Sequence, residues 1–198
     1  MILGHSHVRN LNDVIRTNFR IDSQEADIRL FGRGGMKILD LLSDDIIGTV
    51  QSFQPETLIL MIGDNDVKPS PWTGNVRAAH KIVDKLFEAI LTIHATVSSI
   101  RQVFLCQLLP RHPGRYYRSG YNNIALMVNQ LLLQSAVAAQ QEYLRLFRFR
   151  DFCFPQERPE RYSRNQKLFR RDGTHLTPRG YRRLERAVRA VVVSSIRS

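Results

Sequence analysis

The strongest constraint on the fold of this 198-residue chain is a repeated alternation between two kinds of segment. Short, mostly apolar runs predict β-strands, and they cover residues 1–3, 26–31, 57–62, 102–109 and 143–149. Longer segments, whose apolar residues recur every three to four positions, predict helices near residues 7–19, 37–51, 75–97, 120–142 and 178–196. Strands that each lead into a helix pair in parallel through right-handed crossovers. The predicted fold class is therefore α/β, a three-layer α/β/α sandwich with about five parallel strands.

Composition favours an ordinary globular protein. The chain is 43% hydrophobic, which predicts one domain over residues 1–198. No apolar window approaches the length of a membrane helix and no signal peptide is recognisable, so we expect a soluble, cytoplasmic protein. The two cysteines, Cys106 and Cys153, indicate neither a disulfide framework nor a cysteine metal site.

The net charge of +11 is concentrated at one end of the chain. Residues 142–198 contain fifteen basic and six acidic residues, whereas residues 1–141 contain fourteen and twelve. Clustered arginines attract nucleic acid or an anionic surface, but a solvated basic face explains the same composition. The partner prediction is thus nucleic acid through residues 142–198, with the solvated face as the alternative.

Ligands of open parallel sheets bind beyond the carboxyl ends of the strands, and informative residues follow the first two predicted strands. Gly4-His5-Ser6 comes first, and its serine is either a helix cap or a nucleophile at the sheet edge. Phe31-Gly32-Arg33-Gly34-Gly35 comes second, and its glycines allow backbone N–H groups to approach a ligand.

Two further motifs complete the set. Gly63-Asp64-Asn65-Asp66 follows the third strand, where Asn65 either forms a turn or presents its amide to the same point as Ser6. In Asp172-Gly173-Thr174-His175, the carboxylate precedes the histidine by three residues and can hold its tautomer for proton transfer. Thr177-Pro178 then predicts the start of the last helix, with the threonine as its cap.

Taken together, these four ordered motifs resemble the blocks of the SGNH (GDSL-type) hydrolase superfamily across residues 3–180. The resemblance implies a flavodoxin-like SGNH hydrolase fold and a serine esterase without metal or organic cofactor. Ser6 would be the nucleophile, His175 the general base and Asp172 its orienting partner. The oxyanion hole would combine the Ser6 amide, the Gly35 amide, with Gly34 as the fallback, and the Asn65 side chain. The implied substrate is a small, carbohydrate or lipid acyl ester, most simply an acetyl ester.

More narrowly, the ILGHS, GRGG and MIGDND segments resemble the esterase-like domains of the first open reading frame proteins of some non-LTR retrotransposons. The chain departs from the SGNH pattern at His5, where the family usually has aspartate. This departure puts catalytic efficiency in question. His5 and His7 also flank Ser6, and either could compete with His175 as its partner. The loop from Arg111 to Arg118 interleaves arginine with tyrosine, which suits either a pocket wall, a nucleic-acid contact or a plain surface loop.

Two functional hypotheses follow. The first is an esterase that acts through a Ser6–His175–Asp172 triad. The second is a catalytically inactive SGNH-like domain that binds nucleic acid or an anionic surface through its basic C-terminal third.

Overall fold

The computed structural model describes residues 1–12, 18–21, 24–69, 74–115, 118–139 and 142–196. Its main sheet contains β4 (Leu30–Gly32), β1 (Ile2–Gly4), β5 (Thr57–Met61), β6 (Gln102–Cys106) and β7 (Leu144–Phe147), in that spatial order. All four neighbouring pairs are parallel. The first strand in the chain lies second in the sheet, which is the order of flavodoxin-like folds, and the predicted fold class is confirmed.

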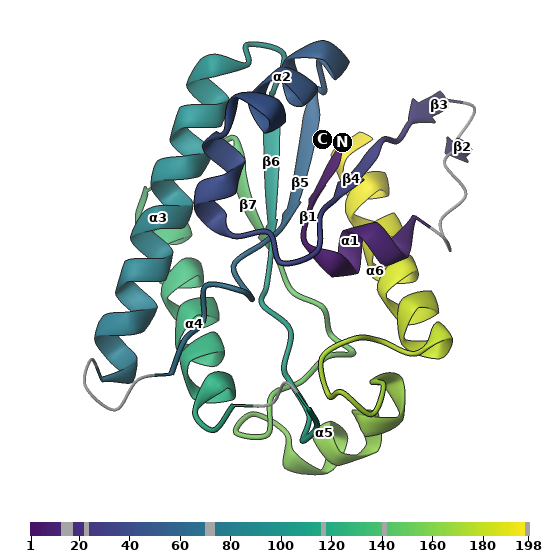
Figure 1. Cartoon of the computed structure of the whole chain (residues 1–198). Coiled ribbons are helices and arrows are strands. Elements are labelled where there is room, and N and C mark those ends of the chain that lie inside the picture. The colour runs from purple at the N-terminus through teal and green to yellow at the C-terminus, as the bar shows by residue number, and fades with distance from the viewer. Residues whose placement is uncertain (13–17, 22–23, 70–73, 116–117, 140–141, 197–198) are drawn as a thin grey trace.

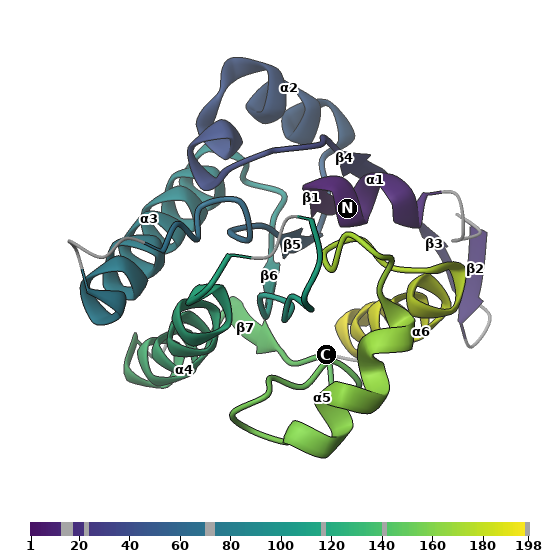
Figure 2. The same ribbon diagram turned by 60° about the horizontal axis from the view of Figure 1, so that its bottom comes forward.

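Helices cover both faces of this sheet (Figures 1 and 2). One face carries the 3-10 helix η1 (Ile38–Leu42) together with α2 (Asp44–Phe53), α3 (Asn75–Thr96) and α4 (Tyr121–Ala139). The other face carries α1 (Ser6–Leu11) and α6 (Pro178–Ile196). The short helices α5 (Pro159–Asn165) and η2 (Gln166–Leu168) lie beyond the carboxyl ends of the strands.

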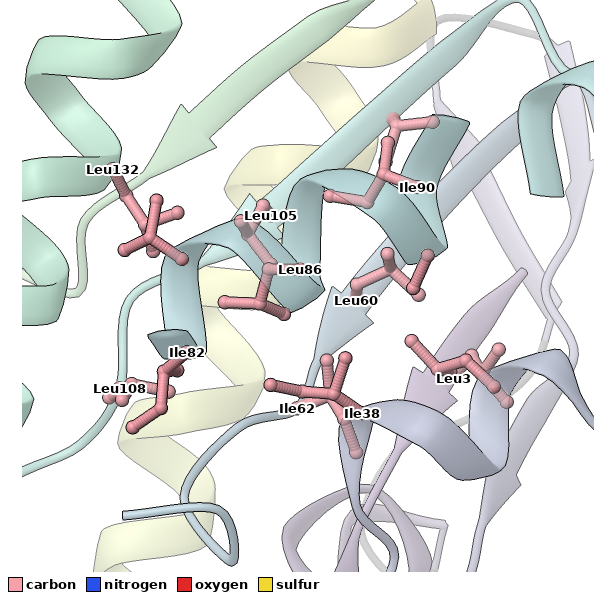
Figure 3. Close-up of a cluster of buried hydrophobic side chains, with 14 of the residues drawn as sticks. Leu3, Ile38, Leu60, Ile62, Ile82, Leu86, Ile90, Leu105, Leu108 and Leu132 are labelled. Carbon is pink, nitrogen blue, oxygen red and sulfur yellow. The ribbon is translucent and has the colours of Figure 1, made fainter. Parts of the chain in front are cut away.

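Each side of the sheet has its own hydrophobic core. Leu60 and Leu105 point from the sheet toward Leu86 and Ile90 of α3, Leu3 belongs to the same cluster, and all five are almost completely buried (Figure 3). The opposite face packs strand residues against α1 and α6. Because every internal strand is buried on both faces, the strands read as continuous apolar runs rather than alternating ones.

Three predicted elements are corrected by the structure. The run 26–31 is not one strand, because β3 (Gln24–Asp27) pairs antiparallel with β2 (Asn18–Ile21) in a separate two-stranded sheet and only β4 joins β1. The helix expected over 7–19 ends at Leu11, residues 18–21 form β2, and residues 13–17 lie outside the described part. The helix expected over 37–51 is two helices, because Ser43 has an extended backbone between them. The sequence of a β-rich run does not show which strand it will pair with, since pairing partners are distant in the sequence.

The start of α6 is confirmed at Pro178. Thr177 Oγ1 accepts a hydrogen bond from the backbone N–H of Gly180 at 3.2 Å, as a capping residue does. This cap fixes the end of the loop that contains Asp172 and His175. Among the described residues, no helix is long and apolar enough to span a bilayer.

Candidate active site

A small cavity lies at the carboxyl edge of the sheet, where the ends of β1, β5 and β6 meet the loop before α6. Its lining comes from the segments that follow those strands and from that loop: His5, Ser6, His7, Asp64, Asn65, Leu109, Pro110, Arg111 and Thr174. Residues from four distant parts of the chain converge here because parallel strands present their carboxyl ends on one side. Ser6 and Asn65, which the sequence predicts to meet, both line this cavity.

Ser6 is the first residue of α1 and does not cap it. The N-cap is His5, whose Nδ1 accepts the backbone N–H of His7 at 3.4 Å. The capping interpretation of Ser6 is therefore wrong, because the serine stands one position inside the helix. Its side chain is half-buried at the cavity wall.

His5 forms a buried pair with Asp64. The two side chains are joined by a 2.8 Å contact between His5 Nε2 and Asp64 Oδ2, and His5 and Asp64 are 3% and 8% exposed. Tyr121 donates its hydroxyl to Asp64 Oδ1 at 2.8 Å, and the backbone N–H of Leu109 donates to the same oxygen at 3.3 Å. Since an ionised carboxylate only accepts, His5 Nε2 carries the proton of this pair.

The electrostatics of Asp64 follow from these partners. Burial alone would raise the pKa of its carboxyl, but the charge and hydrogen bond of His5, with His7 and Arg111 nearby, hold that pKa well below its usual range. Asp64 thus ties the end of β5 to the strand-to-helix turn that carries Ser6. The histidine that departs from the SGNH pattern has a dedicated partner in this chain.

Asp172 and His175 form the second pair of the site. Asp172 Oδ2 lies 2.8 Å from His175 Nδ1, and Asp172 Oδ1 accepts the backbone N–H groups of Thr174 at 2.9 Å and His175 at 2.8 Å. Burial would raise the pKa of Asp172, but these three hydrogen bonds lower it. The carboxylate therefore stays ionised and holds the imidazole in one tautomer.

The loop that carries this pair is held by a close backbone approach. His112 donates its backbone N–H to the Gly173 carbonyl at 2.8 Å. Gly173 has a φ of +72°, and a Cβ there would lie 1.9 Å from the His112 carbonyl oxygen. Only glycine fits this position, because both the space and the backbone angle exclude a side chain.

His7 is buried beside both pairs. Its ring centroid lies 5.1 Å from that of His5 and 6.2 Å from that of His175, and its Nδ1 lies 3.3 Å from the Tyr181 hydroxyl. Burial lowers the pKa of His7 to about 3, and the neighbouring His5 acts in the same direction. His7 is thus neutral at physiological pH and contacts the Tyr181 side of the site.

The expected oxyanion donors do not all line the cavity. Asn65 Nδ2 donates to the Met36 carbonyl at 3.0 Å while the residue lines the cavity with Ser6. Gly35 is exposed with a φ of +75°, and Gly34 is exposed beside the Arg9 guanidinium. Neither glycine belongs to the described lining of the cavity.

Arg111 is a site residue whose role the sequence left open. It lines the cavity, donates from Nη2 to the Asp64 carbonyl at 3.2 Å and lies 4.1 Å from the centroid of the Tyr121 ring. The pocket-wall interpretation of the loop that begins at Arg111 is favoured for this residue. Its guanidinium adds a fixed positive charge to the cavity that contains Ser6.

The sequence model of the GDSL-like Lipase/Acylhydrolase family matches residues 5–183, which include His5 and Ser6 of the first motif and all of the other three motifs. The chain belongs to this family. Solved structures share the fold of this chain, but their sequence identity to it is low. A carbohydrate esterase family 3 protein from Talaromyces cellulolyticus is 16% identical with a TM-score of 0.64, and the match covers 100% of this chain and 97% of that one.

Two further solved structures resemble this GDSL-like protein. An acetyl xylan esterase is 20% identical with a TM-score of 0.62, over 96% of this chain and 98% of that one. A mutant acetyl esterase with an acetate ion is 14% identical with a TM-score of 0.61, over 100% and 97%. No curated protein matches the chain. The family is therefore carried by the sequence model, and the solved structures support the fold.

Proposed function

We propose that this protein is a serine esterase that hydrolyses a short O-acyl ester, with acetyl as the simplest acyl group. Ser6 is the nucleophile, His175 the general base and Asp172 its orienting partner. The observation that carries the proposal is the 2.8 Å Asp172–His175 hydrogen bond on a loop whose Thr174 lines the same cavity as Ser6.

The chemistry requires these groups in these roles. The Ser6 hydroxyl attacks the ester carbonyl carbon while its proton passes to His175 Nε2, since Nδ1 is held by Asp172. The alcohol then leaves with that proton, and water hydrolyses the acyl enzyme by the same path in reverse. Hydrogen bonds between a base and its nucleophile often tighten only when substrate binds.

The tetrahedral oxygen needs preorganised donors. We propose the Ser6 amide, the Gly35 amide, with Gly34 as the fallback, and Asn65 Nδ2. The Asn65 amide group has a second N–H besides the one that donates to Met36, so it can serve both partners. Donors of this kind each contribute about 100- to 1,000-fold to the rate.

The substrate class follows from the small cavity and from the relatives. Two of the solved structures are named as acetyl or acetyl xylan esterases, which supports a small acyl group on a carbohydrate or similar alcohol. Arg111 at the cavity wall favours an alcohol portion with anionic or strongly polar groups over an extended lipid.

A fluorophosphonate probe tests the nucleophile directly. We expect the wild-type protein to be labelled and Ser6→Ala to lose both labelling and hydrolysis of p-nitrophenyl acetate. Ser52→Ala is the matched control, because Ser52 is an exposed serine on α2. Full labelling or full activity in folded Ser6→Ala would contradict the proposal.

A second candidate function is nucleic-acid binding by the basic C-terminal third. It is favoured by a groove on this part of the chain that is lined with arginines. The narrower relationship to retrotransposon-encoded esterase-like domains is also a proposal, and it rests on the ILGHS, GRGG and MIGDND segments. Genomic sequence tests it, because such a reading frame precedes one for a reverse transcriptase.

A further inference from the structure

Two adjoining cavities form one groove on the C-terminal third of the chain. They have volumes of about 690 and about 1120 Å³ and share Asp151, Arg158, Arg161 and Arg183. Residues of α5, η2 and α6 and of the segment that follows β7 line them, and Figure 2 shows α5 in front of the sheet edge with α6 beside it. We call this surface the arginine groove.

The arginine groove has a strong excess of positive charge. Nine basic residues and three acidic residues line it. Two of the three acidic residues form ion pairs. Glu157 pairs with Arg148 at 2.7 Å, and Asp151 pairs with Arg161 at 3.0 Å and with Arg183 at 3.2 Å.

The remaining basic side chains are exposed and have no ion-pair partner among the described residues: Arg150, Arg158, Arg164, Lys167, Arg179 and Arg186. Five of these six are arginines. The groove therefore has positive charge in excess of what its own carboxylates neutralise, and its potential extends into the hollow.

The walls of the groove are held in place. Asp151 joins α5 to α6 through Arg161 and Arg183, and its carbonyl accepts the side-chain amide of Asn165. A backbone hydrogen bond also joins η2 to the start of α6, because the Leu168 carbonyl accepts the Thr177 N–H at 2.8 Å. The exposed arginines thus stand on a scaffold that is assembled before any ligand arrives, which reduces the ordering cost of binding.

The chemistry of this lining indicates a phosphate polymer. Guanidinium groups match phosphate oxygens in a bidentate geometry, and charges spread along a groove suit several successive phosphates. A lipid surface fits less well, because the groove is concave and the exposed large apolar side chains, Leu39, Val76, Leu91 and Leu133, lie on η1, α3 and α4. Duplex recognition usually inserts a protruding element into a groove of the nucleic acid, whereas this surface is a hollow that can track one strand.

We propose that the arginine groove binds the phosphodiester backbone of single-stranded nucleic acid. Arg158, Arg164 and Arg179 are among the contacting residues. The groove shares no lining residue with the cavity that contains Ser6, so this binding does not depend on esterase activity.

Fluorescence anisotropy with a labelled single-stranded oligonucleotide of about 20 nucleotides tests the proposal. The groove variant is Arg158→Gln with Arg164→Gln and Arg179→Gln. The matched control is Arg77→Gln with Lys81→Gln and Arg101→Gln, three exposed basic residues on or next to α3 and β6 that remove the same charge. All six positions are exposed, and thermal melting establishes that both variants are folded.

We expect the control to bind like the wild type and the groove variant to bind about 100-fold more weakly at about 0.1 M salt. The slope of log K against log salt should become shallower by about 2, because three single-strand phosphate contacts are lost. Equal weakening of both variants would overturn the proposal, since overall basicity would then explain binding.

Three other results would also overturn it. They are no wild-type binding at about 50 mM salt, duplex binding as tight as single-strand binding, and binding to phosphatidylserine vesicles without binding to the oligonucleotide. Loss of esterase activity in the Ser6→Ala protein has no bearing on any of these outcomes.

Discussion

Replacing His5 by aspartate, the residue that the SGNH family usually has, should destabilise this protein. His5 is 3% exposed and its Nε2 lies 2.8 Å from Asp64 Oδ2. The substitution removes that donor and adds a second carboxylate next to a buried one. Loss of the helix cap is not the cause, because aspartate is itself a good N-cap residue.

The magnitude follows from the burial of the pair. Removing the His5 donor leaves the buried Asp64 carboxylate uncompensated beside a second carboxylate, which costs about 3–5 kcal/mol. At about 2–4 °C per kcal/mol for a chain of this size, the melting temperature should fall by about 6–20 °C. Two carboxylates at one site raise the pKa of one of them, so the loss relative to wild type should shrink as pH falls from 7 toward 5.

Urea unfolding at both pH values measures the effect, with His5→Asn as the matched control. Asparagine also caps helices and also lacks Nε2, but it adds no charge, so its cost should be about 1–3 kcal/mol and should change less with pH than the cost of His5→Asp. A His5→Asp protein within about 0.5 kcal/mol of wild type would refute the reasoning. So would a cost that stays the same at both pH values.

Three further predictions concern the site and its loop. Asn65→Ala should lower kcat for p-nitrophenyl acetate by about 100- to 1,000-fold without a comparable loss of stability, which steady-state kinetics and melting temperature measure together. Burial lowers the pKa of His7 to about 3 and that of His112 to about 4, so the unfolded chain binds more protons below about pH 6.5. Each of these histidines should therefore lower the free energy of unfolding by about 1.4 kcal/mol for every pH unit of acidification in this range. A free energy of unfolding that does not change between about pH 6 and pH 4 would be inconsistent with this burial. Gly173→Ala should lower the free energy of unfolding by about 1–3 kcal/mol or more, because φ of residue 173 is +72° and the new Cβ would meet the His112 carbonyl. Scanning calorimetry measures the loss of stability, and probe labelling of Ser6 measures the effect on the site. An unchanged melting temperature would contradict this prediction.

Local sequence signals predicted the elements that depend on local chemistry. Thr177-Pro178 predicted the start of α6 because a capping hydroxyl and a preset proline φ act within one turn. Apolar runs predicted the internal strands β1, β5 and β6, because strands buried on both faces need apolar side chains throughout. The same signals could not distinguish β3 from β4, since their partners lie elsewhere in the chain.

The candidate site divides in the same way. Asp172 and His175 are three residues apart, so their hydrogen bond could be expected from spacing. His5 and Asp64 are 59 residues apart, and nothing in either segment indicates that the histidine is paired with that carboxylate. The sequence marked His5 only as a departure from the family pattern.

By itself, the sequence determined the family, the fold class and the composition of the basic C-terminal third. Only the tertiary structure decided which of those basic side chains face one hollow and which carboxylates neutralise them. It also decided that His5, Asp64 and Tyr121 form one buried network beside Ser6. The physical reason is that composition and periodicity report on burial and local backbone preference, whereas charge pairing depends on distances between segments that are far apart in the chain.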